Sequence, residues 1–458
     1  PKGLPVSQRC DTFPARQLPH SFLEIFLIMS RKWNFLSLAL LVLVICFFGD
    51  DYIEYVPGTG ALTIDSGDTS WMVVASAFVL LMTPGLAFFY GGMVDKKNVI
   101  STMLQSFVAL GVISVLWITV GFSLCFGESI GGIIGNPLTY FAFNGVGLAP
   151  NGNFASTIPF LLFALFQLKF AIITPALITG SFAGRIRFRS YILFMVLFSC
   201  VIYPPLAHMT WHPDGLLRNL GVLDFAGGTV VHMSAGFAAL AGAIFLGKRK
   251  ETGGQPANIP FVILGTGLLW FGWFGFNAGS AFAANADAVK AFANTNLASA
   301  TAMITWVFYD RFMNRKMSAL SACIGAIVGL VAITPAAGFV SLGHSMLIGF
   351  IAALVSNWAI RYQKKLAVDD TLDVFASHGI GGVVGMVLTG VLAEDVGLIH
   401  GNPDVFLMHM WTLLGVAVFA FGGSYALYAL VNAMIPMRVS SDQEQRGLDS
   451  SQHGEKLS

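Results

Sequence analysis

The sequence is poor in charged residues. Only 11% of its 458 residues are Asp, Glu, Lys or Arg, whereas 55% are hydrophobic and 40 are Phe. A soluble globular domain carries about 25% charged residues, so the composition excludes an ordinary soluble enzyme or binding domain. The net charge of +1 also lacks the basic excess that is typical of proteins that bind nucleic acid. The composition indicates a polytopic membrane protein.

Cysteine is scarce, and motifs for metal or covalent chemistry are missing. The five Cys residues are scattered and form no CxxC pair, so they predict neither a disulfide framework nor a metal site. No nucleophile, metal cluster or phosphate-binding loop accompanies the histidines described below. We therefore expect no cofactor and no enzymatic activity.

The N-terminal part has the pattern of a targeting segment. Residues 1–28 show no regular pattern and are interpreted as an upstream segment outside the functional chain. Residues 29–49 have a basic start and then an apolar run, which predicts a signal peptide or an uncleaved anchor. Residues 50–70 are expected to be a lead-in segment outside the cytoplasm.

Long apolar stretches follow, and each approaches the roughly 20 residues that cross a bilayer core. We expect eleven membrane-spanning helices in one domain over 71–435, then a cytoplasmic tail over 436–458. The predicted spans are 71–91, 99–126, 156–184, 190–210, 225–247, 259–281, 291–309, 317–335, 342–360, 373–393 and 408–435.

Basic residues are distributed unequally between the loops. The loops after odd-numbered spans hold fourteen Lys and Arg residues, whereas the loops after even-numbered spans hold only Arg218 and Lys290. Cytoplasmic loops of membrane proteins carry the excess of Lys and Arg. The pattern predicts an N-terminus outside the cell membrane and a C-terminus in the cytoplasm.

Two histidines occupy matching positions five spans apart. His232 follows Asp224 by eight residues near the start of span 5, and His378 follows Asp370 by eight residues near the start of span 10. A shift of five spans reverses the direction of a helix in the membrane. The match therefore predicts inverted five-plus-five repeats, an architecture that brings functional residues together near the midplane.

The histidine pair is compatible with several roles. Ionisable residues inside a membrane are costly and usually functional, and an imidazole can transfer a proton near neutral pH. A proton relay or a polar pore lining fits His232 and His378 best, although hydrogen-bonded core histidines remain an alternative. Metal binding fits less well, because two His without a third ligand under-coordinate a divalent ion. Asp224 could support a cation site or simply cap the helix that follows it.

Aromatic residues gather towards the predicted external ends of three spans. A desolvated cation gains about 2 kcal/mol over an aromatic face, so these residues could form a vestibule for a small monovalent cation. Ordinary packing and interfacial anchoring are the alternative. The aromatic residues are Phe166 and Phe170 in 156–184; Trp273, Phe274 and Phe276 in 259–281; and Trp211 after 190–210. Ser280 lies with them at the end of 259–281.

Several motifs in their order along the chain are similar to those of a known family. They include "TPGLAFFYGGMVDKKNV", "FQLKFAIITPALITGSFAGRIRF", "LDFAGGTVVHMSAG", "WFGWFGFNAGSA", "VDDTLDVFASHGIGG" and "EQRGLDSSQHGE". Over about residues 70–456 the chain resembles the ammonium transporter family (Amt/Mep/Rh), and most of all its bacterial-type Amt members. The resemblance implies eleven spans, an inverted repeat and a homotrimer embedded in the lipid of the cell membrane.

The resemblance also implies an external substrate site. Trp211, Phe170 and Ser280 would bind ammonium, and Asp224 would support the bound cation electrostatically from behind. Gln167 would lie near the entrance of this site.

Further residues would form the path through the membrane. Phe170 and Phe276 would be a stacked gate, His232 and His378 the twin histidines of the pore, and Trp273 a neighbour of that pair. Ammonium would lose its proton near the gate and cross as ammonia, with the proton either left outside or transferred through the imidazoles.

Two positions depart from the pattern of the family. Lys169 stands where relatives usually have an uncharged residue, and Gly184 stands where many have Glu before the Arg. Lys169 is expected at a subunit interface or snorkelled to the membrane surface rather than in the pore.

A sensor of the same fold with little or no flux is the alternative to a transporter. Sensor relatives often carry an additional cytoplasmic signalling domain, and the tail over 436–458 is short, which favours transport. A regulatory protein of the PII type is a possible partner at the cytoplasmic face. No nucleic-acid partner is expected.

Overall fold

The computed structural model describes the chain except for residues 1–35, 50–53, 57–61, 252–253, 367 and 458. It divides into two units, 1–50 and 51–458. In the first unit, the apolar run forms a helix over Leu36–Phe48. The predicted upstream segment 1–28 lies outside the described residues, and the choice between signal peptide and anchor stays a prediction.

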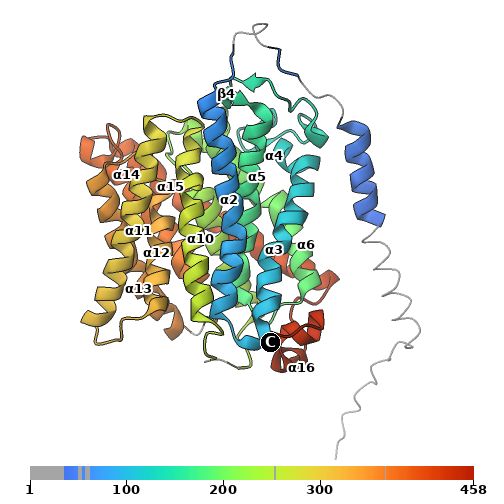
Figure 1. Cartoon of the computed structure of the whole chain (residues 1–458), viewed down its shortest axis with the longest axis vertical. Coiled ribbons are helices and arrows are strands. Elements are labelled where there is room, and N and C mark those ends of the chain that lie inside the picture. The colour runs from blue at the N-terminus through green and yellow to red at the C-terminus, as the bar shows by residue number, and fades with distance from the viewer. Residues whose placement is uncertain (1–35, 50–53, 57–61, 252–253, 367, 458) are drawn as a thin grey trace, which may run out of the picture. The chain divides into compact units, whose positions relative to one another are not determined.

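The second unit is mainly helical. Figure 1 shows its long helices upright and side by side, with β4 near one end and the C-terminus beside α16 at the other. The α-helices are α2 (Ser66–Met93), α3 (Val99–Leu116), α4 (Phe122–Phe126), α5 (Phe160–Ile178), α6 (Phe188–Val201), α7 (Tyr203–Trp211), α8 (Leu216–Asn219), α9 (Ser234–Leu246), α10 (Ile259–Ala278), α11 (Ala286–Phe312), α12 (Ala319–Ile333), α13 (Leu342–Lys365), α14 (Gly381–Leu392), α15 (Pro403–Met434) and α16 (Ser441–Arg446).

Short irregular turns extend or interrupt these helices. The π-helical turns are η2 (Trp117–Gly121), η5 (Gly228–Met233), η7 (Phe375–Ile380) and η9 (Asp449–His453). The 3-10 turns are η1 (Lys96–Asn98), η3 (Phe141–Phe143), η4 (Thr179–Phe182), η6 (Gly279–Ala281) and η8 (Leu398–His400). Two antiparallel hairpins join β1 (Ser129–Ile130) to β2 (Ile134–Gly135) and β3 (Pro150–Asn151) to β4 (Ala155–Pro159).

The helices confirm a polytopic membrane protein of the all-α class. Within the described residues, nine helical segments are long and apolar enough to cross a membrane. The predicted span 291–309 coincides with α11, which is not among these nine. The predicted span 317–335 coincides with α12, whose 15 residues are few for a membrane span. The count of eleven therefore stays a prediction.

Several predicted span limits differ from the helix bounds by up to five residues, and one of these differences has a clear structural cause. The span expected to start at 156 begins at Phe160, because Ala155–Pro159 is an extended strand that pairs with β3. Its apolar residues continue without a break into α5, so composition did not separate strand from helix. The strand holds its hairpin at the N-terminal end of α5, where Asn153 and Phe154 line the candidate site.

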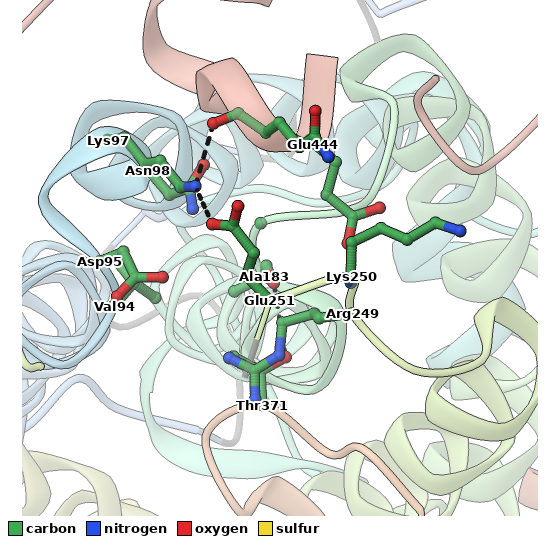
Figure 2. Close-up of a pocket in the computed structure, with 12 residues that line it drawn as sticks. Val94, Asp95, Lys97, Asn98, Ala183, Arg249, Lys250, Glu251, Thr371 and Glu444 are labelled. Carbon is green, nitrogen blue, oxygen red and sulfur yellow. Dashed lines mark hydrogen bonds and ion pairs between the residues drawn. The ribbon is translucent and has the colours of Figure 1, made fainter. Parts of the chain in front are cut away.

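The loops after predicted spans 1 and 5 meet the C-terminal tail on one face. The Lys97 ammonium lies 2.7 Å from the Glu251 carboxylate and donates to the carbonyl of Gln445 at 3.0 Å. The Lys250 amide donates to the Glu444 carboxylate at 2.6 Å. Figure 2 shows these side chains around one small pocket. The loops thus share one side, as alternating spans require, while the absolute orientation remains a prediction.

The tail is also fastened to the start of α3. The Asp449 carboxylate accepts hydrogen bonds from the amides of Ser101 at 2.7 Å and Ile100 at 3.1 Å. The Leu448 amide donates to the Asn98 side chain at 2.9 Å. A carboxylate at a helix N-terminus satisfies free N–H groups and is favoured by the helix dipole. The tail is therefore part of the folded unit.

Buried Arg185 ties the loop after α5 to the loop before η7. Its guanidinium donates to the hydroxyl of Thr371 at 2.6 Å and to the carbonyls of Ser181 and Asp369. Burial lowers the pKa of Arg185 to about 10, so the group still carries its charge at neutral pH. This contact fixes the segment that carries His378.

Asp373 lies in that same loop and has both an unusual backbone conformation and a raised pKa. Its backbone has a φ of 55°, in the left-handed region. Burial raises the pKa of its carboxyl to about 7, although Lys364 opposes the shift. Folded Asp373 keeps its proton up to about pH 7, whereas an unfolded Asp loses it near pH 4. The free energy of unfolding should therefore fall as the pH rises from about 4 to 7 and stay lower above that range.

We predict that Asp373→Asn raises the free energy of unfolding by about 1–2 kcal/mol at pH 8 and has almost no effect at pH 4. Asn keeps the neutral form at every pH and tolerates the left-handed backbone. Thermal unfolding in detergent at several pH values measures the effect. Asp395→Asn is the matched control, because Asp395 has a φ of 65° but is exposed. A pH-independent change would contradict the prediction.

Candidate functional site

A cavity of about 420 Å³ opens among α5, α7, η6 and the loop before η5. All four residues expected to bind substrate line it, namely Trp211, Phe170, Ser280 and Asp224. Gln167, expected near the entrance, lines it as well. The structure thus brings into one cavity five residues that come from four segments of the chain.

Aromatic rings and a hydroxyl form the wall of this outer cavity. The rings of Phe170 and Trp211 meet edge to face, with centroids 5.7 Å apart. The Trp211 indole donates to the carbonyl of Asp224 at 3.2 Å. The Ser280 hydroxyl donates to the carbonyl of Phe276 at 2.8 Å, which leaves the Ser280 oxygen able to accept hydrogen bonds from a ligand. Such a wall suits a small cation that carries N–H groups.

Asp224 caps the helix that carries His232. Its carboxylate accepts hydrogen bonds from the amides of Gly227, Gly228 and Thr229 at 2.7 to 2.8 Å, and also from the Thr229 hydroxyl. The side chain is buried, with the residue 7% exposed. The capping interpretation describes its hydrogen bonds, and Asp224 also lines the cavity.

Gly227 is needed where the chain turns beneath the cavity. Its φ is 115°, and a Cβ there would lie 2.8 Å from a methyl of Val231 and 3.4 Å from the Trp211 indole. Any side chain would be strained and would crowd Val231. The glycine lets the capped turn pass close behind Trp211.

Two stacked phenylalanines separate the outer cavity from a much smaller one. The ring centroids of Phe170 and Phe276 are 4.2 Å apart, with an angle of 31° between the planes. Phe170 lines the outer cavity, and Phe276 lines the inner cavity, whose volume is only about 10 Å³. The pair therefore lies at the boundary where a gate was expected.

The two histidines meet in the inner cavity. Nδ1 of His232 lies 3.3 Å from Nδ1 of His378, and both rings are buried. Trp273 stacks on His232 with centroids 5.3 Å apart and donates to the Thr334 hydroxyl at 2.9 Å. In a hydrogen bond between two imidazoles one nitrogen must donate and the other accept. The pair can therefore hold one proton between its rings.

Glycines next to the histidines allow this contact. A Cβ on Gly236 would lie 2.2 Å from the amide nitrogen of Gly379, closer than any real Cβ contact. Gly236 is one helical turn after His232, and Gly379 follows His378 directly. The backbones of α9 and η7 therefore touch, which brings the two imidazoles within hydrogen-bond distance.

The two histidine segments are built alike. Each histidine lies in a six-residue π-helical turn, η5 or η7, that leads directly into an α-helix. Oδ2 of Asp224 accepts from the amide of Thr229, and Oδ2 of Asp370 accepts from the amide of Phe375 at 2.7 Å, in both cases five residues further on. The shared capping pattern supports the predicted internal repeat.

Asp370 has a structural role in the loop before η7. Besides Phe375, it accepts from the Gln363 side chain at 3.3 Å, and burial raises its pKa above the ordinary value for Asp. Its contacts fix the loop before η7. It does not line either of the cavities described above.

The site combines a polar and aromatic outer cavity, a barrier of two rings and a narrow cavity with two histidines. Together with the spanning helices, this arrangement defines a membrane transport protein rather than an enzyme. Residues 70–457 match the Ammonium Transporter Family. The chain belongs to that family.

Relatives with known names agree over most of their length. An ammonium transporter of Aquifex aeolicus is 46% identical over 400 residues, which cover 86% of this chain and 93% of that protein. An ammonium transporter of Bacillus subtilis is 43% identical and covers 85% of this chain and 98% of that protein. The crystal structure of Saccharomyces cerevisiae Mep2 is 34% identical with a TM-score of 0.78, covering 83% of this chain and 88% of Mep2.

The structure also places the two unusual positions. Lys169 on α5 is half-buried and is not among the residues that line the outer or the inner cavity. Gly184 has a φ of 81° and lines the small pocket between the loops and the tail, where a Cβ would be 3.1 Å from the side-chain amide nitrogen of Asn98. Neither residue contacts the histidine pair.

Several residues of the outer cavity were not identified from the sequence as site residues, among them Arg218 and Phe282. Arg218 lines the cavity, and its guanidinium donates to the carbonyl of Trp211 at 2.9 Å. Phe282 lines it just beyond the predicted end of a span. From the sequence, Arg218 was counted only among the basic loop residues. Its place seven residues after Trp211, a predicted site residue, was the one hint that it could lie nearby. Among the residues lining the cavity, Arg218 is the basic residue and Asp224 the acidic one.

We predict that Arg218→Gln lowers the half-saturating concentration for ammonium. A like charge several ångströms from a bound cation costs on the order of 0.5–1 kcal/mol near a surface, which corresponds to about a two- to fivefold change. Gln removes the charge and keeps a donor for the Trp211 carbonyl. The concentration dependence of transport in liposomes measures the shift.

The matched control is Lys169→Met, which removes a positive charge from α5. Because Lys169 does not line the cavity, we expect its removal to leave the half-saturating concentration unchanged. If Lys169→Met tightened binding as much as Arg218→Gln, the assignment of these two charges would be wrong.

Proposed function

We propose that this protein transports ammonium across the cell membrane by recruiting it in the outer cavity, deprotonating it and conducting ammonia past the twin histidines. One observation supports this proposal above others. An aromatic and polar cavity of about 420 Å³ is separated by the ring pair Phe170 and Phe276 from a cavity of about 10 Å³ with two imidazoles. The names of the relatives from Aquifex aeolicus and Bacillus subtilis add to this support.

Recruitment would take place against the aromatic wall. Trp211 and Phe170 offer ring faces that attract a cation once its water is removed. Ser280 accepts one N–H hydrogen bond, and the buried carboxylate of Asp224 adds negative potential from behind. Gln167 lies at the same cavity and can exchange hydrogen bonds with a substrate that is losing its water.

The inner cavity would then exclude charge. Its lining as described is apolar except for His232, His378 and the indole of Trp273. A bare ion cannot replace its hydration shell there. Ammonium can leave its proton at the gate and enter as ammonia, whereas potassium has no proton to lose. Selectivity follows from this chemical difference between the two ions.

The proton has two possible routes. It can remain on the outer side, which makes transport electroneutral, or it can follow through the coupled imidazoles, which makes transport electrogenic. The hydrogen bond of 3.3 Å between the His232 and His378 nitrogens would join the two rings along the second route. Both routes use the same path for ammonia.

The setting of this activity is a further part of the proposal. The chain would cross the membrane eleven times with its N-terminus outside and its C-terminus in the cytoplasm, as a homotrimer in lipid. The basic loops and the docked tail would then form the cytoplasmic face, where a PII-type regulator could bind.

A sensor is the second candidate function. A solved structure described as a sensor Amt protein is 30% identical with a TM-score of 0.78, and the match covers 84% of this chain and 98% of that chain. The same fold therefore occurs in a protein named as a sensor. The two functions are distinguished by the flux of ammonium, which a transporter carries and a sensor carries little or not at all.

We predict that ammonium evokes a current on a solid-supported membrane carrying the reconstituted protein, and that His232→Ala reduces this current more than tenfold. The loss follows because one half of the imidazole pair is removed. His400→Ala is the control, since His400 is exposed in η8. Ammonium uptake is measured in parallel, because uptake without current would assign the electroneutral route. Neither current nor uptake in the wild type would overturn transport in favour of the sensor.

A further inference from the structure

His409 is a buried histidine on α15 that does not line the outer or the inner cavity. Nδ1 of its ring lies 2.9 Å from the carbonyl oxygen of Met386 on α14, and Nε2 lies 3.0 Å from the amide nitrogen of Leu223. A carbonyl oxygen only accepts and an amide nitrogen only donates, so Nδ1 carries the hydrogen and Nε2 accepts. Both nitrogens of a neutral imidazole are therefore used to join α14 to the loop before η5.

This loop carries Asp224, which follows Leu223 directly. The amide on the other side of Asp224, that of Phe225, donates to the carbonyl of Pro335 at 3.1 Å. The backbone of Asp224 is thus anchored on both sides, by a side chain of α15 and by the segment after α12. The carbonyl of Asp224 accepts in turn from the Trp211 indole. The anchors therefore affect two groups of the outer site, the Asp224 carboxylate and the Trp211 ring.

Gly390 on α14 lets the His409 ring lie against that helix. A Cβ on Gly390 would lie 3.2 Å from Cγ of the ring, which is tighter than an ordinary contact. Because α14 continues directly from η7, Met386 lies eight residues after His378 in one continuous helical segment. His409 thus connects the loop of the outer site to the helical segment that carries a pore histidine.

The geometry points to His409 as a positioning residue for the outer site, which holds the Asp224 carboxylate where it stabilises bound ammonium. This inference rests on the proposed function. Leu223 lines the outer cavity, so without the imidazole its amide can pair with water and the loop can shift. The Asp224 carboxylate would move with the loop, and its attraction for the cation would weaken.

The expected signature is a loss of affinity with little change in the maximal rate. A displaced carboxylate weakens binding of the cation, whereas the ring pair of Phe170 and Phe276 and the two pore histidines stay in place. A purely structural defect would instead lower the amount of active protein, and with it the maximal rate, without changing the half-saturating concentration. The two explanations therefore predict different changes.

The experiment measures transport by the reconstituted wild type, His409→Leu and His409→Gln as a function of ammonium concentration. Leu offers neither donor nor acceptor, so we expect the half-saturating concentration to rise about three- to tenfold while the maximal rate stays within about twofold. A displacement of about 1 Å changes the attraction between two nearby charges by a factor of this order. Gln carries an N–H donor and an oxygen acceptor, so it should restore a value near that of the wild type.

Tyr428→Phe is the matched control on the same helix. The buried Tyr428 hydroxyl donates to the carbonyl of Ala238 on α9 at 3.2 Å, and Tyr428 does not line the outer cavity. The variant removes a buried hydrogen bond between α15 and another helix but leaves the Asp224 loop anchored. We expect its half-saturating concentration to equal that of the wild type.

His409→Ala is the second variant in case His409→Leu does not fold, because water can enter the space left by the ring and pair with the freed backbone groups. If either variant transports ammonium with an unchanged half-saturating concentration, the inference is wrong. A rise in His409→Gln or Tyr428→Phe as large as that in His409→Leu would also overturn it. A wild type without flux would instead contradict the proposed function.

Discussion

The backbone contact between Gly236 and Gly379 is the constraint on which the histidine site depends. The two segments touch so closely that a methyl group at Gly236 would overlap the amide of Gly379. Because His232 and His378 lie within one turn of these glycines, the same contact sets the distance between the imidazoles. The capping carboxylates of Asp224 and Asp370 then fix where each histidine segment begins. Because neither glycine carries a side chain, the two imidazoles can approach each other within the apolar interior.

The change of environment along the path is abrupt. The outer cavity has room for a cation with part of its water, whereas the inner cavity holds about one water-sized sphere. The ring pair of Phe170 and Phe276 lies at the boundary of the two. Because the interaction of a charge with its surroundings depends steeply on the local dielectric, an ion is less favoured in the inner cavity than in the outer cavity.

Much of this arrangement could be predicted from the sequence. Apolar stretches gave the helices because bilayer thickness fixes their length, and the repeated spacing from Asp224 to His232 and from Asp370 to His378 identified the pair before any geometry was known. Family motifs brought Trp211, Phe170 and Ser280 together. The roles of these residues remain proposals, while their common cavity is a feature of the structure.

Other features lay beyond sequence patterns for physical reasons. The strand Ala155–Pro159 merges with the apolar start of α5, so hydropathy alone could not end one element and begin the other. The left-handed backbone of Phe282 is imposed by tertiary contacts, since phenylalanine has no local preference for it. Arg218 reaches the cavity through a loop conformation that its spacing from Trp211 suggests but does not determine.

The π-helical turns η5 and η7 make the site sensitive to chain length as well as to residue type. Each turn lies at the start of the helix that carries its histidine, just after the capping Asp. Loss of one residue between the capping Asp and the histidine would shift the histidine by one helical position and rotate it by about 100°. His232 or His378 would then face packing instead of its partner. Variation in these two segments should therefore occur by substitution, while insertions and deletions accumulate in the external loops.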